Sequence, residues 1–502
     1  MIKITLDKEA YRDKVYACFI GKNIGGTMGA PYEGKREVLD VEGFVTEEGV
    51  VLPNDDLDLQ LAWLYALEQY GPYAITPELL GEFWLSYIVP HWNEYGIGKA
   101  NMRRGLPPPM SGDYDNDWQN SNGAWIRTEI WATVCPALPH AAAKYAATDA
   151  MVDHGAGEGT FAAAFVAAMQ SAAFAVPELK KCIEIGLSAI PAESRMAKSI
   201  RFVLDLYEAG TDWLAARNEV QKLNADIGNG WFEAPSNVTY AVIGLLWGEG
   251  DFKKSMITAI NCGDDTDCTA ATVGATMGIL YGMAGIPEDW RRHIGDDIVT
   301  ISLVKSSNGS YFPKTCTELT ERIVRIAPFA LHANSTRYTN WGYTGVFFEL
   351  GVELGVGDEI AEDTYGRLLE LCRGRVAKEL ECLRPYTAYG ESNLANATLS
   401  LGCEPDASRN KEIGVHLLIE SKCYFESAPR TANFRWIIPD GFKVEGPKTL
   451  FVPDFNPHTC GRKECDFTIV VPENPAPVSK ILLEISFNER LSPIYISFPI
   501  YS

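Results

Sequence analysis

Apolar residues recur at helical spacing through the first two thirds of the chain. Recurrence at three- and four-residue intervals predicts amphipathic helices over the stretches Leu57–Tyr70, Gly159–Phe174, Ser199–Glu208, Asn237–Leu246 and Cys316–Leu331. Several of these stretches are rich in alanine, glycine and threonine, whose small side chains allow helix axes to approach closely. We therefore expect residues 1–332 to form a compact all-helical domain.

The pattern changes to strict alternation after about residue 412. Apolar and polar residues alternate in the short runs 414–420, 433–438, 466–471 and 481–487, which are separated by Pro, Asn and Gly. Such runs predict the strands of a β-sandwich, and residues 360–385 can hold a helix near the junction. The sequence thus predicts a multidomain α plus β protein, with a β-rich, sandwich-like accessory domain over residues 333–502.

Residues 91–125 fit neither pattern. They contain three successive Pro, several Gly and three Trp, and a structureless segment of this length in a compact domain usually has a function. Because Trp faces suit bases and sugars, the segment can form a wall of a ligand site. A surface loop pinned by buried aromatic rings is the alternative.

Composition excludes some partners. The net charge of −22 over 502 residues argues against a nucleic-acid polymer, whose phosphates need a basic surface, but a small anion needs only a few local donors. The start shows no apolar signal region and no apolar stretch is long enough for a membrane span, so we expect a cytoplasmic protein. We expect the twelve Cys to be mostly reduced, and the short pair Cys460 and Cys465 lacks further zinc ligands.

Two acidic runs suggest chemistry. Asp55–Asp56 precedes a predicted helix, where aspartates also serve as ordinary caps. Asp264, Asp265 and Asp267 open a second helix made almost wholly of small residues, and three carboxylates cannot all be caps. Crowded carboxylates repel one another unless a cation neutralises them, and Mg²⁺, Mn²⁺ or Ca²⁺ suits their oxygens. One cation that joins the two runs would explain both.

Four segments, taken in order, resemble motifs of the ADP-ribosylglycohydrolase family. They are Gly25–Glu33, Asn54–Leu57, Asn122–Arg127 and Gly263–Cys268, with a weaker match at Asp153–His154. The resemblance spans roughly residues 10–330 and leaves out the C-terminal β region. It implies an all-helical fold and a centre of one or two Mg²⁺ or Mn²⁺ ions with the ligands Asn54, Asp55, Asp56, Asp265, Asp267 and Cys268.

The chain departs from the family pattern at several of these positions. Asn54 and Cys268 stand where the family has Thr, Gly26 replaces an acidic residue and Leu57 replaces a Thr. Sulfur binds hard cations poorly, so the choice between one ion and two stays open. Two extra acids, Asp58 and Asp264, either compensate for these changes or face solvent.

The resemblance also assigns roles to single residues. Glu33 is the first candidate for proton transfer and Asp56 the second, although Glu33 can also be a surface acid after a turn. The candidate substrate-binding residues are Asp117, Asn122, Gly123, Arg127 and His154, and for the last two a buried structural role is the alternative.

The implied activity is metal-dependent hydrolysis of the N- or O-glycosidic bond of an ADP-ribosyl group. The expected partner is a small anionic sugar-nucleotide or an ADP-ribosylated substrate. Two alternatives remain: hydrolysis of another ribosyl or small-sugar glycoside, and a binding protein whose catalytic centre has decayed.

Overall fold

The computed structural model describes residues 2–305, 311–335, 337–339, 346–348, 350–422, 429–452, 461–488 and 491–502. The chain forms two compact units. The first comprises Met1–Gly96, Asp117–Tyr338 and Phe347–Cys382, and the second comprises Ile97–Asn116, Thr339–Val346 and Leu383–Ser502. The first unit therefore continues past residue 332, where the sequence placed the end of the helical domain.

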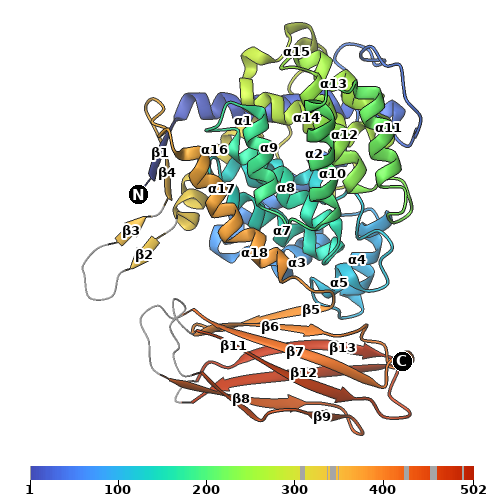
Figure 1. The fold of residues 1–502 in the computed structure, drawn as a ribbon, viewed down its shortest axis with the longest axis vertical. Coiled ribbons are helices and arrows are strands. Elements are labelled where there is room, and N and C mark those ends of the chain that lie inside the picture. Colours follow the sequence, from blue (N-terminus) through green and yellow to red (C-terminus); the bar gives the residue numbers. More distant parts are fainter. Residues whose placement is uncertain are drawn as a thin grey trace. The chain divides into compact units, whose positions relative to one another are not determined.

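The first unit consists mainly of helices (Figure 1). These are α1 (Lys8–Gly29), α2 (Asp55–Tyr70), α3 (Pro77–Tyr87), α6 (Glu129–Val134), α7 (Pro139–His154), α8 (Glu158–Ala172), α9 (Leu179–Ser188), α10 (Arg195–Glu208), α11 (Trp213–Leu223), α12 (Ala234–Trp247), α13 (Phe252–Asn261), α14 (Thr266–Tyr281), α15 (Glu288–Ile294), α16 (Cys316–Asn334), α17 (Thr364–Gly374) and α18 (Val376–Glu381). Short 3-10 turns lie at η1 (Ala30–Tyr32), η2 (Pro72–Ala74), η3 (Trp125–Arg127) and η4 (Met283–Gly285). The predicted helical stretches are confirmed as α2, α8, α10, α12 and α16. No helix among the described residues has the length and apolar character needed to cross a membrane.

The first unit also contains strands, so the all-helical detail of our expectation is wrong. β1 (Ile2–Asp7) pairs in parallel with β4 (Leu350–Gly355), in a register that runs from Ile2 opposite Leu350 to Asp7 opposite Gly355. The alternating residues Ile4 and Leu6 are buried, which is the period-two pattern of a strand with one covered face. A further short pair is formed by β2 (Arg337–Thr339) and β3 (Val346–Phe348).

The second unit contains two antiparallel sheets (Figure 1). One has the order β5 (Thr387–Glu391), β6 (Ala395–Leu401), β7 (Glu412–Ser421), β11 (Arg462–Val470) and β9 (Lys443–Glu445), and the other has β10 (Thr449–Val452), β8 (Arg430–Ile437), β12 (Val478–Phe487) and β13 (Ile494–Tyr501). Leu417 of β7 and Leu483 of β12 lie in one shared apolar core, as in a two-layer sandwich. The four predicted strands correspond to β7, β8, β11 and β12. Cys465 lies partly buried in β11, and Cys460 is outside the described residues.

The segment 91–125 is not structureless, contrary to our expectation. It contains α4 (Asn93–Arg103) and α5 (Met110–Asp113), because two proline-free stretches between the turns can each close helical hydrogen bonds. Trp125 is fully buried, which favours the alternative of a segment pinned by aromatic rings. Trp118 is only half-buried.

Helices α1 and α14 cross at very short range. A Cβ atom on Gly25 of α1 would lie 2.3 Å from the carbonyl carbon of Ala270 in α14, and one on Gly21 would lie 2.2 Å from the carbonyl oxygen of Gly274. Only glycine allows backbones to approach this closely. Because Asp267 lies in the first turn of α14, this glycine seam sets where the acidic residues of α14 lie.

Candidate functional site

The ends of three helical elements supply the acidic residues of the candidate centre. Glu33 directly follows η1, Asp55 and Asp56 form the start of α2, and Asp267 lies in the first turn of α14. The N-terminus of α2 is capped by Asn54, whose Oδ1 accepts the backbone N–H of Asp56 at 2.7 Å. An Asn cap of this kind satisfies a helix end that would otherwise leave free N–H groups.

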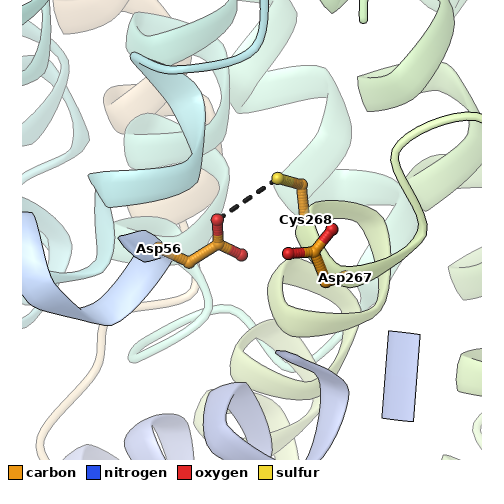
Figure 2. A group of neighbouring side chains, drawn as sticks. All are labelled: Asp56, Asp267 and Cys268. Carbon is orange, nitrogen blue, oxygen red and sulfur yellow. Dashed lines mark hydrogen bonds between the residues drawn. The ribbon is translucent and has the colours of Figure 1, made fainter. Parts of the chain in front are cut away.

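The two aspartate pairs meet in space. One ligand atom each from Asp56, Asp267 and Cys268 lies within 4.8 Å of the others, and the same holds for Glu33, Asp265 and Asp267. Asp267 belongs to both groups and so links them. Figure 2 shows the thiol of Cys268 directed at Asp56, with the Cys268 Sγ donating to Asp56 Oδ1 at 3.2 Å.

The crowding of these carboxyl groups changes their protonation. The charge of Asp267, followed by burial, raises the pKa of Glu33 to about 8. Burial, followed by the charge of Asp267, raises the pKa of Asp55 to about 6, even though Tyr95 donates a hydrogen bond to its Oδ2 at 3.0 Å. Burial likewise raises the pKa of Asp265. The group therefore favours the uptake of positive charge, as protons or as a cation.

Three carboxylate oxygens in this group have no hydrogen-bond partner. They are Asp56 Oδ2, Asp265 Oδ1 and Asp267 Oδ1, and all three are buried. A buried polar atom without a partner is costly. Cation binding beside Asp267 would satisfy such oxygens, since carboxylate oxygens are the ligands that Mg²⁺ and Mn²⁺ prefer.

Asn54, Gly26 and Cys268, which differ from the family pattern, each have a defined role in the structure. The Asn54 carbonyl oxygen caps α2, and a Cβ atom on Gly26 would lie 1.9 Å from the Asn54 Nδ2. Gly26 therefore makes room for the Asn54 amide. Burial raises the pKa of the Cys268 thiol well above its usual value, so it stays protonated and donates to Asp56. Neither Asn54 nor Cys268 offers a free ligand atom of the hard type.

Neither of the two extra acids faces solvent, so that part of the expectation is wrong. Asp58 is fully buried, and its Oδ2 accepts the backbone N–H groups of Ile301 at 2.6 Å and Ser302 at 2.5 Å. Asp264 is also buried and accepts the N–H of Phe232 and, at 3.0 Å, the amide of Asn237. Both acids hold backbone segments in place.

The candidate substrate residues on the loop before α6 are tied to protein partners. The Asn122 Nδ2 donates to Asp265 Oδ2 at 2.6 Å, and its Oδ1 accepts the indole N–H of Trp125 at 2.9 Å. Asn122 thus orients a carboxylate of the centre. The carbonyl oxygen of Gly123 accepts from Arg127, and Asp117 is exposed on the preceding segment.

Arg127 and His154 lie in the interior. Arg127 is fully buried, with its guanidinium 3.0 Å from Asp149 and 2.8 Å from Asp153. His154 is also fully buried, with Nδ1 3.0 Å from Asp153 Oδ1 and Nε2 3.3 Å from the Ser121 hydroxyl. This geometry favours the structural alternative for both residues.

Three aromatic side chains form a group near Asp264, and among them only Trp118 belongs to the segment 91–125 that the sequence singled out. Trp118 lies 6.3 Å from Trp231, and Trp231 stacks on Phe232 at 4.4 Å, with all three half-buried. Phe232 is anchored by its N–H to Asp264, the neighbour of Asp265. The turn of Gly, Asn and Gly that precedes Trp231 and Phe232 is the signal that could have pointed to them.

A cavity of about 330 Å³ has Asp264 in its lining. The lining also includes the cationic residues Arg36, Arg217 and Lys222 and the acidic residue Glu233. The guanidinium of Arg217 donates to protein acceptors, among them the carbonyl oxygen of Cys262 at 2.9 Å, whereas Arg36 is exposed.

Comparison with known proteins places this geometry in a family. The chain is similar over 50 residues to ADP-ribosylarginine hydrolases of Pseudomonas putida, at 38% identity, and Serratia proteamaculans, at 40%. These matches cover 10% of this chain and 14% of either relative. A solved structure titled an ADP-ribosylglycohydrolase-related protein complex is 20% identical, covers 65% of this chain and 100% of its own, and has a TM-score of 0.41. The family model of the ADP-ribosylglycohydrolases matches residues 7–331, and the chain therefore belongs to the ADP-ribosylglycohydrolase family.

Proposed function

We propose that this protein hydrolyses the N- or O-glycosidic bond of an ADP-ribosyl group with the help of a bound divalent cation. The observation that carries the proposal is a pair of acidic groups joined by Asp267, one with Asp56 and one with Asp265, in which each of the three aspartates has a buried, unpartnered carboxylate oxygen. Such a cluster is unfavourable as an empty structural element and well suited to an ion that holds a sugar.

Asp56, Asp265 and Asp267, each with one unpartnered oxygen, are the residues that would hold the ion. Their oxygens suit Mg²⁺ or Mn²⁺. Asn54 and Cys268 are engaged as a helix cap and as a thiol donor, which favours one ion over two. When bound, such an ion supplies Lewis acidity toward ribose hydroxyls and water.

Glu33 is the group that moves the proton. It is the exposed member of the acidic cluster and can exchange protons with water and with a leaving group. The charge of Asp267 raises its pKa to about 8, and a catalytic acid or base works best with a pKa near the working pH. Asp55 and Asp56 are held in fixed directions by Tyr95 and Cys268, so they orient the reacting atoms.

The rest of the substrate would lie on the aromatic group and the cavity beyond it. The half-buried faces of Trp118, Trp231 and Phe232 suit the flat base of a nucleoside, since aromatic stacking needs no charge. The exposed guanidinium of Arg36 lines the adjoining cavity and gives a diphosphate a donor of matching charge. Both features favour a sugar-nucleotide over a simple sugar.

The leaving group proposed first is an arginine side chain. This choice rests on the names of the two similar bacterial proteins, which are ADP-ribosylarginine hydrolases. The reaction to measure is the release of free arginine from ADP-ribosyl-arginine, with ADP-ribosyl-serine as the comparison substrate.

The test is release of ADP-ribose in the presence of Mg²⁺ or Mn²⁺, with and without a chelator. Asp265→Asn should abolish turnover and weaken cation binding, and Glu33→Gln should abolish turnover while cation binding remains. Glu37→Gln is the matched control, because Glu37 is exposed on the same segment and lies outside the described metal-ligating groups. Cleavage of simple ribosides alone would overturn the ADP-ribosyl assignment. Tight cation binding without turnover of any glycoside would overturn the enzymatic one.

A further inference from the structure

A second group of ionisable side chains is buried apart from the carboxylate centre. Glu94 lies in the first turn of α4, and Asp153 and His154 end α7. Their exposed fractions are 5%, 1% and 0%, and one ligand atom from each lies within 4.8 Å of the others. The proposed reaction uses none of the three.

The ring nitrogens of His154 both face polar atoms of this group. Nδ1 is buried without a hydrogen-bond partner and lies 3.0 Å from a carboxylate oxygen of Asp153. Nε2 lies 3.3 Å from the Ser121 hydroxyl.

Two buried polar atoms of this group have no hydrogen-bond partner, the Glu94 Oε2 and the His154 Nδ1. A buried polar atom without a partner is costly. The Asp153 carboxylate beside them is paired with Arg127 at 2.8 Å. A cation held by Glu94, Asp153 and His154 would satisfy both unpartnered atoms.

We propose that Glu94, Asp153 and His154 bind a divalent transition-metal ion of the Zn²⁺ class at a site separate from the carboxylate centre. The ligand set of one imidazole nitrogen and two carboxylate oxygens suits Zn²⁺. Magnesium, which prefers oxygen ligands alone, suits it poorly. With the ion on Nδ1, the Nε2–H would be directed at the Ser121 hydroxyl 3.3 Å away, an outer contact of the kind that orients a metal-binding imidazole.

Such an ion would stabilise the loop that reaches the carboxylate centre. Ser121 contacts His154, and the next residue, Asn122, donates to Asp265 at 2.6 Å. The ion would therefore hold the loop from behind while Asn122 orients the carboxylate in front. This role is structural, so it stands whether or not the proposed reaction is correct.

The test measures zinc directly. The full-length protein is loaded with Zn²⁺, passed through metal-free buffer and analysed for zinc content and X-ray absorption. We expect the bound zinc to include one Zn²⁺ per chain with an imidazole ligand, and that ion to be lost in Glu94→Gln and His154→Asn. The carboxylate centre offers only oxygen and sulfur, so an imidazole ligand reports on the second site. Asp265→Asn should retain this zinc, and so should the control His140→Asn, which changes another buried histidine of α7.

Two results would overturn the proposal. One is a folded wild-type protein that retains no zinc after loading. The other is zinc that Asp265→Asn removes while Glu94→Gln and His154→Asn both retain it. Circular dichroism identifies any variant that fails to fold, and the zinc content and absorption spectrum of the wild type then decide the question alone.

Discussion

The glycine seam between α1 and α14 offers a direct test of how the fold holds the acidic centre. In Gly25→Ala the new Cβ would lie 2.3 Å from the backbone of Ala270, whereas carbon contacts are normally about 3.5–4.0 Å. The helices must therefore separate by roughly 1 Å. Overpacking of this kind costs about 1–3 kcal/mol or more, which exceeds the gain of about 1 kcal/mol in helix propensity.

The assay is urea unfolding followed by tryptophan fluorescence, with a matched substitution as control. Gly366 lies inside α17, and a Cβ atom there would meet nothing within 4 Å. Gly366→Ala should therefore leave stability unchanged or raise it by up to about 1 kcal/mol. Gly25→Ala should lower the free energy of unfolding and weaken Mn²⁺ binding, because Asp267 moves with α14. Equal stability of the two variants would refute the close approach.

Four further predictions follow from single contacts. Burial raises the pKa of Asp58 to about 7, so the folded state binds this proton more tightly than the unfolded state, and stability falls as pH rises from about 4 to about 7. Asp58→Asn should reduce the fall in melting temperature between about pH 5 and about pH 8, and an unchanged fall would contradict it. Arg127→Met removes the guanidinium that pairs with two buried aspartates and should cost about 3–5 kcal/mol in urea unfolding; a variant of wild-type stability would show that those pairs are absent. Gly26→Asp should lower the melting temperature strongly, and adding Asn54→Thr should restore most of it, since the Cβ at position 26 falls 1.9 Å from the Asn54 amide; equal losses with and without the second change would disprove the link. Trp231→Ala should raise the Kd for ADP-ribose about tenfold, the size of one base-stacking contact, and unchanged calorimetric affinity would remove the aromatic group from the binding site.

Local patterns predicted local structure well. The helical spacing of residues 57–70 predicted α2, and the alternation of residues 481–487 predicted β12, because burial on one face leaves its period in the sequence. The family motifs predicted that the carboxylates of two distant helix starts would lie together. These predictions needed only neighbouring residues, or a resemblance that already contained the tertiary arrangement.

Features that depend on distant segments were missed. The six residues of β1 gain a strand partner only from β4, far along the chain, and nothing in either segment identifies the other. The contribution of Trp231 to the aromatic group depends on the bridge that joins Ser121 to Glu233. In the sequence, Asp58 resembles an ordinary polar residue on the surface of a helix. It is buried because the distant residues Ile301 and Ser302 pack against it and donate their backbone N–H groups to its carboxylate.

The parallel pairing of β1 with β4 has a consequence for how the protein is made. The ribosome releases β1 first, and β4 follows only after about 340 further residues, which at roughly 5–20 residues per second takes on the order of half a minute. During that time the apolar side chains of Ile4 and Leu6, which are buried in the finished fold, have no strand beside them. The helical unit therefore becomes complete only late in translation, and until then the nascent chain presents an open strand edge that a chaperone can cover.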